Sequence, residues 1–152
     1  MSIRKASLSD LNIVYKITEV TISEIYPHYY SKGAVEFFLT HHNEKNIAND
    51  IEQNKVFLCL DMEQNIVGTV TIKDNEICRL FVLPQCQKNG YGTEMLDYAE
   101  KIILGEYFSI TLDASLPAKR IYQKRGYKST EFNMIATMYD DFLCYDVMVK
   151  EI

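Results

Sequence analysis

The residues best placed to do chemistry form a short glycine-containing segment, Gln87-Lys88-Asn89-Gly90-Tyr91-Gly92, followed by Thr93. Glycine lets a backbone turn sharply and approach a ligand closely. The residues after this segment have helical periodicity, and the start of a helix offers unpaired N–H groups and the positive end of the helix dipole. Together these features predict an anion site suited to a pyrophosphate, to which the Thr93 hydroxyl could add a donor.

Other phosphate-binding patterns fit this segment less well. A dinucleotide-binding fold needs a third glycine, where this chain has Met95, and it places its loop after the first strand rather than the fourth. A P-loop needs a Gly-Lys-Ser/Thr sequence, which does not follow here. Glycine pairs before helices also occur as plain loop chemistry, so the segment by itself leaves its role open.

A buried strand before the segment and an amphipathic helix after it should position these groups. Residues 76–82 are apolar on both alternating faces except for Glu76 and Arg79, as expected for a central strand. Residues 93–103 repeat apolar side chains at helical spacing. A further strand is expected over 108–113, and a right-handed strand-helix-strand unit would make it parallel to the first.

The rest of the chain completes a mixed α/β pattern. Further strands are expected at 3–5, 55–60, 66–72, 131–137 and 142–149, and helices at about 9–25 and 35–42, with another helical turn or two at 47–51 and a short helix from Pro117 to near Gly126. Ser7 and Asp10 have capping-box-like spacing before the first helix. The order β-α-α-β-β-β-α-β-α-β-β predicts a mixed sheet with helices on both faces, in one domain over 1–152.

Bulk composition argues against several classes of function. The net charge of −5 does not favour binding to a phosphate backbone, and no apolar run approaches the roughly 20 residues of a membrane helix. The four cysteines form no C-x-x-C pair, which favours free thiols in a reducing compartment over disulfides or a metal site. The N-terminus lacks the apolar core of a signal peptide. We therefore expect a cytoplasmic protein with no nucleic-acid partner, no membrane partner and no metal.

Two motifs follow each other along the chain. The first is Arg79-Leu80-Phe81-Val82-x-Pro84-x-x-Gln87-x-x-Gly90-x-Gly92, and the second is Ala118-x-x-x-Tyr122-x-x-x-Gly126-Tyr127. They resemble, in sequence, order and separation, the two signatures of the GNAT superfamily of N-acetyltransferases. The predicted element order fits that superfamily too. The resemblance implies a GNAT-like acyl-CoA N-acyltransferase fold and acetyl-CoA (coenzyme A) as the cofactor.

The resemblance also implies which residues hold the cofactor. In the family, the strand before the loop lends backbone groups to the pantetheine arm, and the loop backbone holds the phosphates. The matching residues are Leu80, Phe81, Val82, Gln87, Lys88, Asn89, Gly90, Tyr91, Gly92 and Thr93. Ser115 stands where relatives often have Asn, and its shorter side chain puts that contact in doubt.

Tyr122 matches a tyrosine that many relatives place near the cofactor sulfur, where it can protonate the departing thiolate. A phenol with an ordinary pKa of about 10 is a competent acid at neutral pH. The same residue could instead pack on the sheet with its hydroxyl bonded to backbone. The resemblance favours the catalytic role, with Tyr122 also in contact with the cofactor.

The general base is less clearly marked. An alkylamine has a pKa of about 10.4, so the enzyme must either accept a proton or bind the minor neutral form. Glu76 has the spacing from Gly90 of the catalytic Glu in histone-acetylating relatives, and strand alternation would place it on one face with Cys78, Leu80 and Val82. It could equally be a solvated strand-end carboxylate. His28 is a second candidate, and an acyl-cysteine at Cys78 or Cys86 is a remote alternative to direct transfer.

The acceptor site is expected beside the first two helices, the 26–30 loop and the 138–141 turn. Tyr26, Tyr29 and Tyr30 could line a pocket or pack under the helix junction. Glu24, Glu36 and Asp141 could attract a cationic amine or be plain surface charges. The prediction is transfer of an acetyl group to a primary amine of a small molecule or peptide. The alternative is a non-catalytic acyl-CoA sensor or subunit, and an exposed edge at the C-terminal strands would permit a homodimer.

Overall fold

A seven-stranded sheet is the framework of the protein, and the computed structural model describes residues 1–152 of it. The strands are β1 (Ser2–Lys5), β2 (Val56–Leu60), β3 (Ile66–Lys73), β4 (Glu76–Val82), β5 (Ser109–Ala114), β6 (Lys128–Ala136) and β7 (Phe142–Glu151). Their order across the sheet is β1-β2-β3-β4-β5-β7-β6, and only the β4–β5 pair is parallel. The predicted mixed sheet is confirmed, and β1 and β6 are its two edges.

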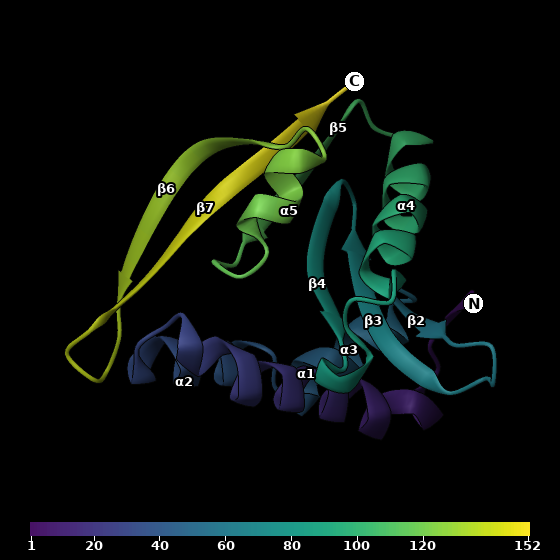
Figure 1. Ribbon diagram of the computed structural model, residues 1–152, viewed down its shortest axis with the longest axis horizontal. Coiled ribbons are helices and arrows are strands. Elements are labelled where there is room, and N and C mark those ends of the chain that lie inside the picture. Colours follow the sequence, from purple (N-terminus) through teal and green to yellow (C-terminus); the bar gives the residue numbers. More distant parts are fainter.

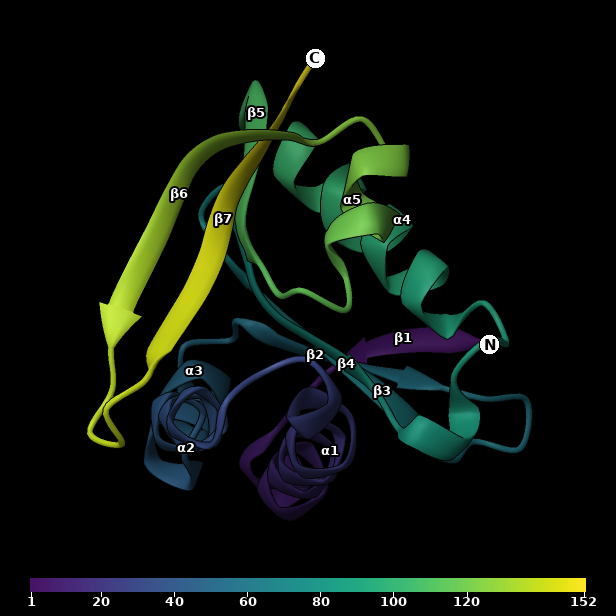
Figure 2. The same ribbon diagram turned by 60° about the vertical axis from the view of Figure 1, so that its left-hand side comes forward.

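Helices cover both faces of the sheet (Figures 1 and 2). The α-helices are α1 (Leu11–Ile25), α2 (Lys32–His41), α3 (Glu44–Glu52), α4 (Tyr91–Leu104) and α5 (Lys119–Lys124). Helices α1, α2 and α3 lie on one side, whereas α4 and α5 lie on the other. None of these helices has the length and apolar character that crossing a membrane would require.

Two layers of apolar side chains attach these helices to the sheet. Met95, Ala99 and Ile103 of α4 are buried against apolar residues of β3, β4 and β5. On the opposite face, Val14 of α1 and Ile47 of α3 are buried against β2. Both stripes follow the helical spacing of apolar residues in the sequence, which is why the two-faced arrangement was predictable.

The segment around Asn43 differs from the prediction. The sequence predicts two helices before the second strand with only a turn or two beyond them, whereas α3 is a separate third helix. His42 leaves helical geometry at φ −103° and ψ 44°, and the Asn43 side chain then accepts a hydrogen bond from the backbone N–H of Asn46. An Asn N-cap of this kind starts a new helix immediately after the break. The predicted 26–30 loop likewise contains a 3₁₀ helix, Tyr26–His28.

Strands β4 and β5 stay together over a very short stretch. Only Glu76 with Thr111 and Ile77 with Leu112 are paired, after which the strands part. Beyond that point β5 continues with β7, while β4 continues with β3. The sheet is therefore split into two halves that diverge, and the β6–β7 hairpin leans away from β1–β4 (Figure 2). Backbone groups on the inner side of β4 are left without a neighbouring strand.

A β-bulge in β4 lies at the same place. Thr71 pairs with Arg79 but Ile72 pairs with Ile77, so Cys78 is an extra residue on β4. A bulge of this kind reverses the alternation of side chains and bends the strand. Accordingly Ile77 and Val82 belong to the core beneath α4, whereas Phe81 belongs to the cluster beneath α1.

A buried ion pair holds β4 to α3. The Arg79 guanidinium contacts Asp50 at 3.1 Å, donates to Thr71 Oγ1 at 2.9 Å, and donates through Nε to His42 Nδ1 at 3.2 Å. The side chains of Arg79 and Asp50 are each only 4% exposed. Lys73 adds a second cation to Asp50 at 2.8 Å. Every polar group in this network is paired, which is what allows a charge to be buried here.

Replacing Asp50 should therefore destabilise the fold strongly. In Asp50→Ala the Arg79 charge stays buried without its partner, and we expect a loss of about 3–5 kcal/mol in the free energy of unfolding. Asp97→Ala is the matched control, because Asp97 is 62% exposed in its pair with Arg125 and should cost less than about 1 kcal/mol. Urea unfolding followed by circular dichroism would measure both values. Equal, small losses would contradict the role assigned to Asp50.

Candidate active site

The glycine segment joins the end of β4 to the start of α4. A 3₁₀ turn, Pro84–Cys86, follows the strand, and α4 begins at Tyr91 with Gly90 as its N-cap at φ 89°. The Gln87 side chain donates to the Val82 carbonyl at 3.1 Å, and the Asn89 side chain donates to the Cys86 carbonyl at 3.0 Å. These two side chains hold the turn, so the anion-binding capacity rests on backbone N–H groups at the start of α4.

The two glycines leave open space at this point. A Cβ built at Gly90 would meet no atom within 4 Å, and one built at Gly92 would meet only Val82 Cγ2 at 3.9 Å. The positive φ of Gly90 is strained for other residues, whereas Gly92 has ordinary helical geometry. Side chains here would fill the space in front of the unpaired N–H groups. The segment therefore fits a phosphate group that approaches the backbone closely.

A cavity of about 610 Å³ begins at this segment and runs between the two halves of the sheet. Of the residues expected to bind a cofactor, the cavity is lined by Leu80, Phe81, Val82, Gln87, Lys88, Gly90, Tyr91, Gly92, Thr93, Ser115 and Tyr122. Asn89 is outside the lining, consistent with its use inside the turn. The cavity lies along the inner side of β4, where the parting of the strands exposes backbone groups.

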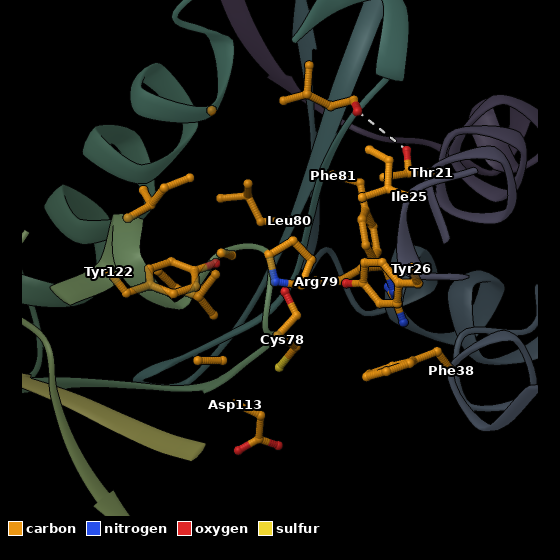
Figure 3. Close-up of a pocket in the computed structure, with 18 of the residues that line it drawn as sticks. Thr21, Ile25, Tyr26, Phe38, Cys78, Arg79, Leu80, Phe81, Asp113 and Tyr122 are labelled. Carbon is orange, nitrogen blue, oxygen red and sulfur yellow. Dashed lines mark hydrogen bonds between the residues drawn. The ribbon is translucent and has the colours of Figure 1, made fainter. Parts of the chain in front are cut away.

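Tyr122 projects from α5 into the middle of the cavity, across from Leu80 (Figure 3). The residue is 8% exposed, and its ring packs edge-on against Tyr127 at 5.6 Å between centroids. Desolvation raises the pKa of its hydroxyl to about 12. The side chain is thus held by packing while its neutral hydroxyl faces the cavity, which is the arrangement a proton donor needs.

Glu76 lies at the start of β4, outside the residues that line the cavity. The bulge at Cys78 overturns the expectation that Glu76 shares a face with Leu80 and Val82, because the extra residue shifts the alternation between them. Glu76 is half-buried, and its pKa is raised by desolvation and then by the nearby charge of Asp113. The carboxylate is therefore a better proton acceptor than an exposed one, although it stands back from the cavity wall.

Comparison with known proteins identifies the family. A family model described as "Acetyltransferase (GNAT) domain" matches residues 25–141. The chain belongs to the GNAT acetyltransferase family. It is accordingly an acyl-CoA-dependent acetyltransferase, and acetyl-CoA is the family's acyl donor. The resemblance seen in the two sequence motifs is confirmed. No curated protein sequence gives a significant match.

Solved structures share the fold of this acetyltransferase. A GCN5-related N-acetyltransferase from Rhodopseudomonas palustris is 22% identical, with 99% of this chain and 95% of that chain covered and a TM-score of 0.88. The PaiA N-acetyltransferase of Thermoplasma acidophilum, in complex with coenzyme A, is 20% identical, with coverages of 99% and 98% and a TM-score of 0.77. YncA of Salmonella typhimurium, with its cofactor acetyl-CoA, is 14% identical, with coverages of 99% and 93% and a TM-score of 0.74. At these identities the likeness concerns the fold.

The far end of the cavity contains residues that the sequence analysis missed. Asp113, Tyr145 and His41 line it, from β5, β7 and α2 respectively. In this acetyltransferase Asp113 follows directly on the last residue of β5 that pairs with β4, so only the parting of the strands makes it a cavity residue. The one signal for Asp113 in the sequence was its position as a carboxylate at the end of a strand that was predicted to pair in parallel with the strand at 76–82.

Several residues considered for acceptor binding have other positions. Glu24, Glu36 and Asp141 do not line the cavity, and His28 and Tyr29 do not either. Asp141 instead accepts a hydrogen bond from the Gly33 backbone N–H at 3.0 Å, which ties the tip of the β6–β7 hairpin to α2. The Tyr30 hydroxyl accepts one from the Leu116 backbone N–H at 2.6 Å. Asp141 and Tyr30 therefore connect segments next to the cavity without lining it.

Tyr26 both packs and lines the cavity. It is 7% exposed, its ring lies edge-on to Phe38 at 4.8 Å, and it faces the cavity in Figure 3. Ser115 interacts with its hydroxyl, while desolvation raises its pKa. The two roles considered for this residue are therefore compatible.

Two nearby side chains, His42 and Cys78, are poorly suited to act as a proton-transfer group or a nucleophile near pH 7. Desolvation, followed by the Arg79 charge, lowers the pKa of His42 to about 3, so this imidazole is neutral near pH 7. Desolvation also raises the pKa of Cys78 to about 12, with the Glu76 charge adding to it. A thiol is a nucleophile only as its thiolate, so this environment disfavours an acyl-cysteine at Cys78.

The open space at Gly92 allows a direct test of the loop. In Gly92→Val the new side chain meets little protein, so the variant should fold, but it should occupy the phosphate position and weaken coenzyme A binding at least about 100-fold, because the backbone approach is lost. Lys101→Val, exposed on the same helix, is the matched control for helix propensity. Isothermal titration with coenzyme A measures the effect. A folded Gly92→Val protein with wild-type affinity would refute the assignment.

Proposed function

We propose that the enzyme transfers an acetyl group from acetyl-CoA directly to a primary amine of a small molecule or peptide. The observation that supports this most is the position of Tyr122, whose neutral hydroxyl faces the middle of one continuous cavity. The glycine segment forms one end of that cavity, and Asp113 and His41 lie toward the other. A donor entering from the first end and an acceptor entering from the second would meet beside Tyr122.

The cofactor-binding residues follow from this arrangement. Backbone N–H groups of Tyr91, Gly92 and Thr93 would bind the pyrophosphate at the start of α4. The unpaired inner side of β4 at Leu80, Phe81 and Val82 would hydrogen-bond the pantetheine arm. Bound acetyl-CoA supplies the thioester that is attacked. The Leu80 and Phe81 segment is the nearest source of backbone donors for polarising its carbonyl.

Tyr122 is proposed as the general acid. Its raised pKa keeps the hydroxyl protonated across the physiological range, so it can always donate. Ile121 and Ala118 beside it line the cavity too. The leaving thiolate would take this proton, and the phenol would regain one from solvent afterwards.

Glu76 is proposed as the proton acceptor, acting through a chain of waters. It is the first residue of β4 and does not line the cavity, so it does not contact the amine directly, whereas bridging waters can relay a proton to it. Its raised pKa brings the carboxylate closer to the amine in basicity. Binding of the neutral amine from solution remains the competing route, and it needs no base.

A non-catalytic acyl-CoA sensor is the competing function. Ser115 supports it, because this side chain is shorter than the Asn of relatives and interacts with the Tyr26 hydroxyl, which leaves it less available to a cofactor. The enzyme is favoured because Tyr122 keeps a hydroxyl in the cavity. Measuring thiol release from acetyl-CoA over a panel of amines separates the two: tight coenzyme A binding without release on any amine would identify the sensor.

The same observations bear on organisation and location. We infer one acetyltransferase domain over 1–152, since all seven strands, from β1 near the N-terminus to β7 near the C-terminus, belong to one hydrogen-bonded sheet. The four cysteines are free, which suits a reducing compartment and hence the cytoplasm. Edge strand β6, with exposed Phe132 and Met134, offers a surface for a homodimer.

Replacing Tyr122 tests the acid directly. Tyr122→Phe keeps the ring packing but removes the hydroxyl, so we expect kcat to fall by about 10–100-fold while coenzyme A affinity changes less than about threefold. Tyr29→Phe, an exposed tyrosine outside the cavity, is the control. Steady-state kinetics and titration with coenzyme A give the two quantities. Unchanged kcat in Tyr122→Phe would remove it from the mechanism.

The pH dependence of kcat tests Glu76. A base must be deprotonated to act, and the pKa of Glu76 is raised, so kcat should fall as pH drops through a value above the usual 4.5. Glu76→Gln should lose this acid limb and lower kcat by about 100-fold or more. Asp74→Asn, an exposed change two residues away, should keep the limb. An unchanged acid limb in Glu76→Gln would exclude Glu76 as the base.

A further inference from the structure

One buried imidazole lines the cavity on the side opposite Tyr122. His42 is 9% exposed, and its ring is edge-on to the ring of Phe81 at 5.9 Å between centroids. Figure 3 shows Phe81, together with Tyr26 and Phe38, across the cavity from Tyr122. This wall is mainly aromatic, so each polar atom on it can fix the orientation of a ligand.

The hydrogen bond with Arg79 determines which nitrogen of His42 carries the proton. Arg79 Nε donates to His42 Nδ1 at 3.2 Å. A guanidinium has donors only, so Nδ1 is the acceptor and carries no hydrogen. Desolvation, followed by the Arg79 charge, lowers the pKa of this imidazole to about 3, so the ring holds a single proton at neutral pH. That proton is therefore on Nε2, and His42 is a hydrogen-bond donor at that atom.

The Nε2 atom has no partner inside the protein. The imidazole of His42 makes one hydrogen bond, which is the one at Nδ1. Every side-chain nitrogen or oxygen that is sealed from solvent in this structure has a partner. Nε2 is therefore not sealed, and the space that His42 lines is the cavity. A side chain that is more than nine-tenths buried thus presents one N–H group to the cavity.

This N–H group favours a ligand that brings an oxygen atom. A buried donor that is left without an acceptor costs free energy, so a bound molecule that covers Nε2 without pairing it is disfavoured. The hydrogen bond from Arg79 to Nδ1 adds to the effect, because hydrogen bonds in series polarise one another. A site with such a donor discriminates against analogues that lack the matching oxygen.

The surroundings favour an uncharged oxygen over a carboxylate. The cations nearest to His42, Arg79 and Lys73, are both bound to Asp50, and His42 itself is neutral. Asp113 also lines the cavity, so a carboxylate would meet a like charge there and no free cation. A carbonyl oxygen accepts the same hydrogen bond without that repulsion. An amide carbonyl is therefore the group that suits this position best.

We propose that His42 is a specificity-determining residue whose Nε2–H binds an uncharged carbonyl oxygen of the acceptor, so that the preferred amine belongs to an amide or peptide rather than to a plain alkylamine. This rests on the proposed amine acetylation. The carbonyl is held on the aromatic wall, while the amine points toward Tyr122 on the other side of the cavity. His42 neither gives up nor takes a proton during the transfer.

Two substitutions separate the roles of the two nitrogens. In His42→Asn, Oδ1 takes the place of Nδ1 and can still accept from Arg79, but no atom replaces Nε2–H. In His42→Gln, the longer side chain brings its NH2 group to the position of Nε2 and restores a donor, while the acceptor for Arg79 is displaced. The first variant should lose ligand recognition, and the second should lose stability. His28→Asn, an exposed change outside the cavity, is the matched control.

Each variant is assayed with two pairs of acceptors: glycinamide with ethylamine, and β-alaninamide with propylamine. The kcat/KM of the amide is divided by that of the alkylamine, and comparison of this ratio with the wild-type ratio cancels differences in amine basicity. In His42→Asn the ratio should fall about five- to tenfold for at least one pair, because one neutral hydrogen bond is lost. In His42→Gln and His28→Asn it should stay within about threefold of wild type.

A ratio that His42→Asn leaves unchanged for both pairs overturns the proposal, while amine acetylation stands. A larger loss with glycine than with glycinamide overturns it too, because the bound oxygen would then belong to a carboxylate. No thiol release with any acceptor, in protein that still binds coenzyme A, overturns amine acetylation as well.

Nitrogen NMR shifts of the wild-type histidine side chains test the proposal even where His42→Asn fails to fold. The proton of His42 should be on Nε2, and the Nε2 signal should shift when the product N-acetylglycinamide binds. A proton on Nδ1, or an Nε2 signal that bound product leaves unchanged, would overturn the proposal.

Discussion

The parting of β4 from β5 after two paired residues is the constraint on which the rest of the structure depends. A parallel pair that continued would satisfy the backbone of β4 and leave no room between the sheet halves. Because the strands separate, the inner side of β4 is open to a ligand and the cavity can run between the halves. The same separation gives the cavity two ends, one at the glycine segment and one at Asp113.

Keeping two strands apart requires that each half be held from elsewhere. On the β4 side, the Cys78 bulge turns Arg79 toward α3, and Asp50 of α3 and Thr71 of β3 bind its guanidinium. On the β5 side, the strand pairs with β7 along its whole length, and Asp141 at the hairpin tip binds the start of α2. The hairpin tip is thus tied to a helix that packs in the same cluster as Phe81 of β4, so contacts within the protein hold the opening without a ligand.

Much of this could be predicted from the sequence because the signals are local. Apolar periodicity predicted the strands and α4, and the glycines predicted the turn before α4. The spacing of Ser7 and Asp10 predicted a capping box, which the structure contains. Tyr122 followed from the resemblance to the family, and it lies in the cavity as that resemblance implies. Each of these features depends on residues within a few positions of one another.

The features that were not predicted depend on residues far apart in the chain. One extra residue at Cys78 reversed the alternation, and no composition signal marks such a bulge, so the face assigned to Glu76 was wrong. The Arg79 network joins three distant segments, and a charged residue in an apolar strand does not reveal its partners. Asp113 became a cavity residue only through the geometry of two strands.

A crystal structure with coenzyme A bound tests the central claim most directly. The account predicts the pyrophosphate on the backbone N–H groups after Gly90, the pantetheine arm along Leu80–Val82, and the sulfur within about 3.5 Å of the Tyr122 hydroxyl. It also predicts that the cavity between the sulfur and Asp113 stays free for an acceptor. A pyrophosphate bound elsewhere, or a sulfur remote from Tyr122, would contradict it.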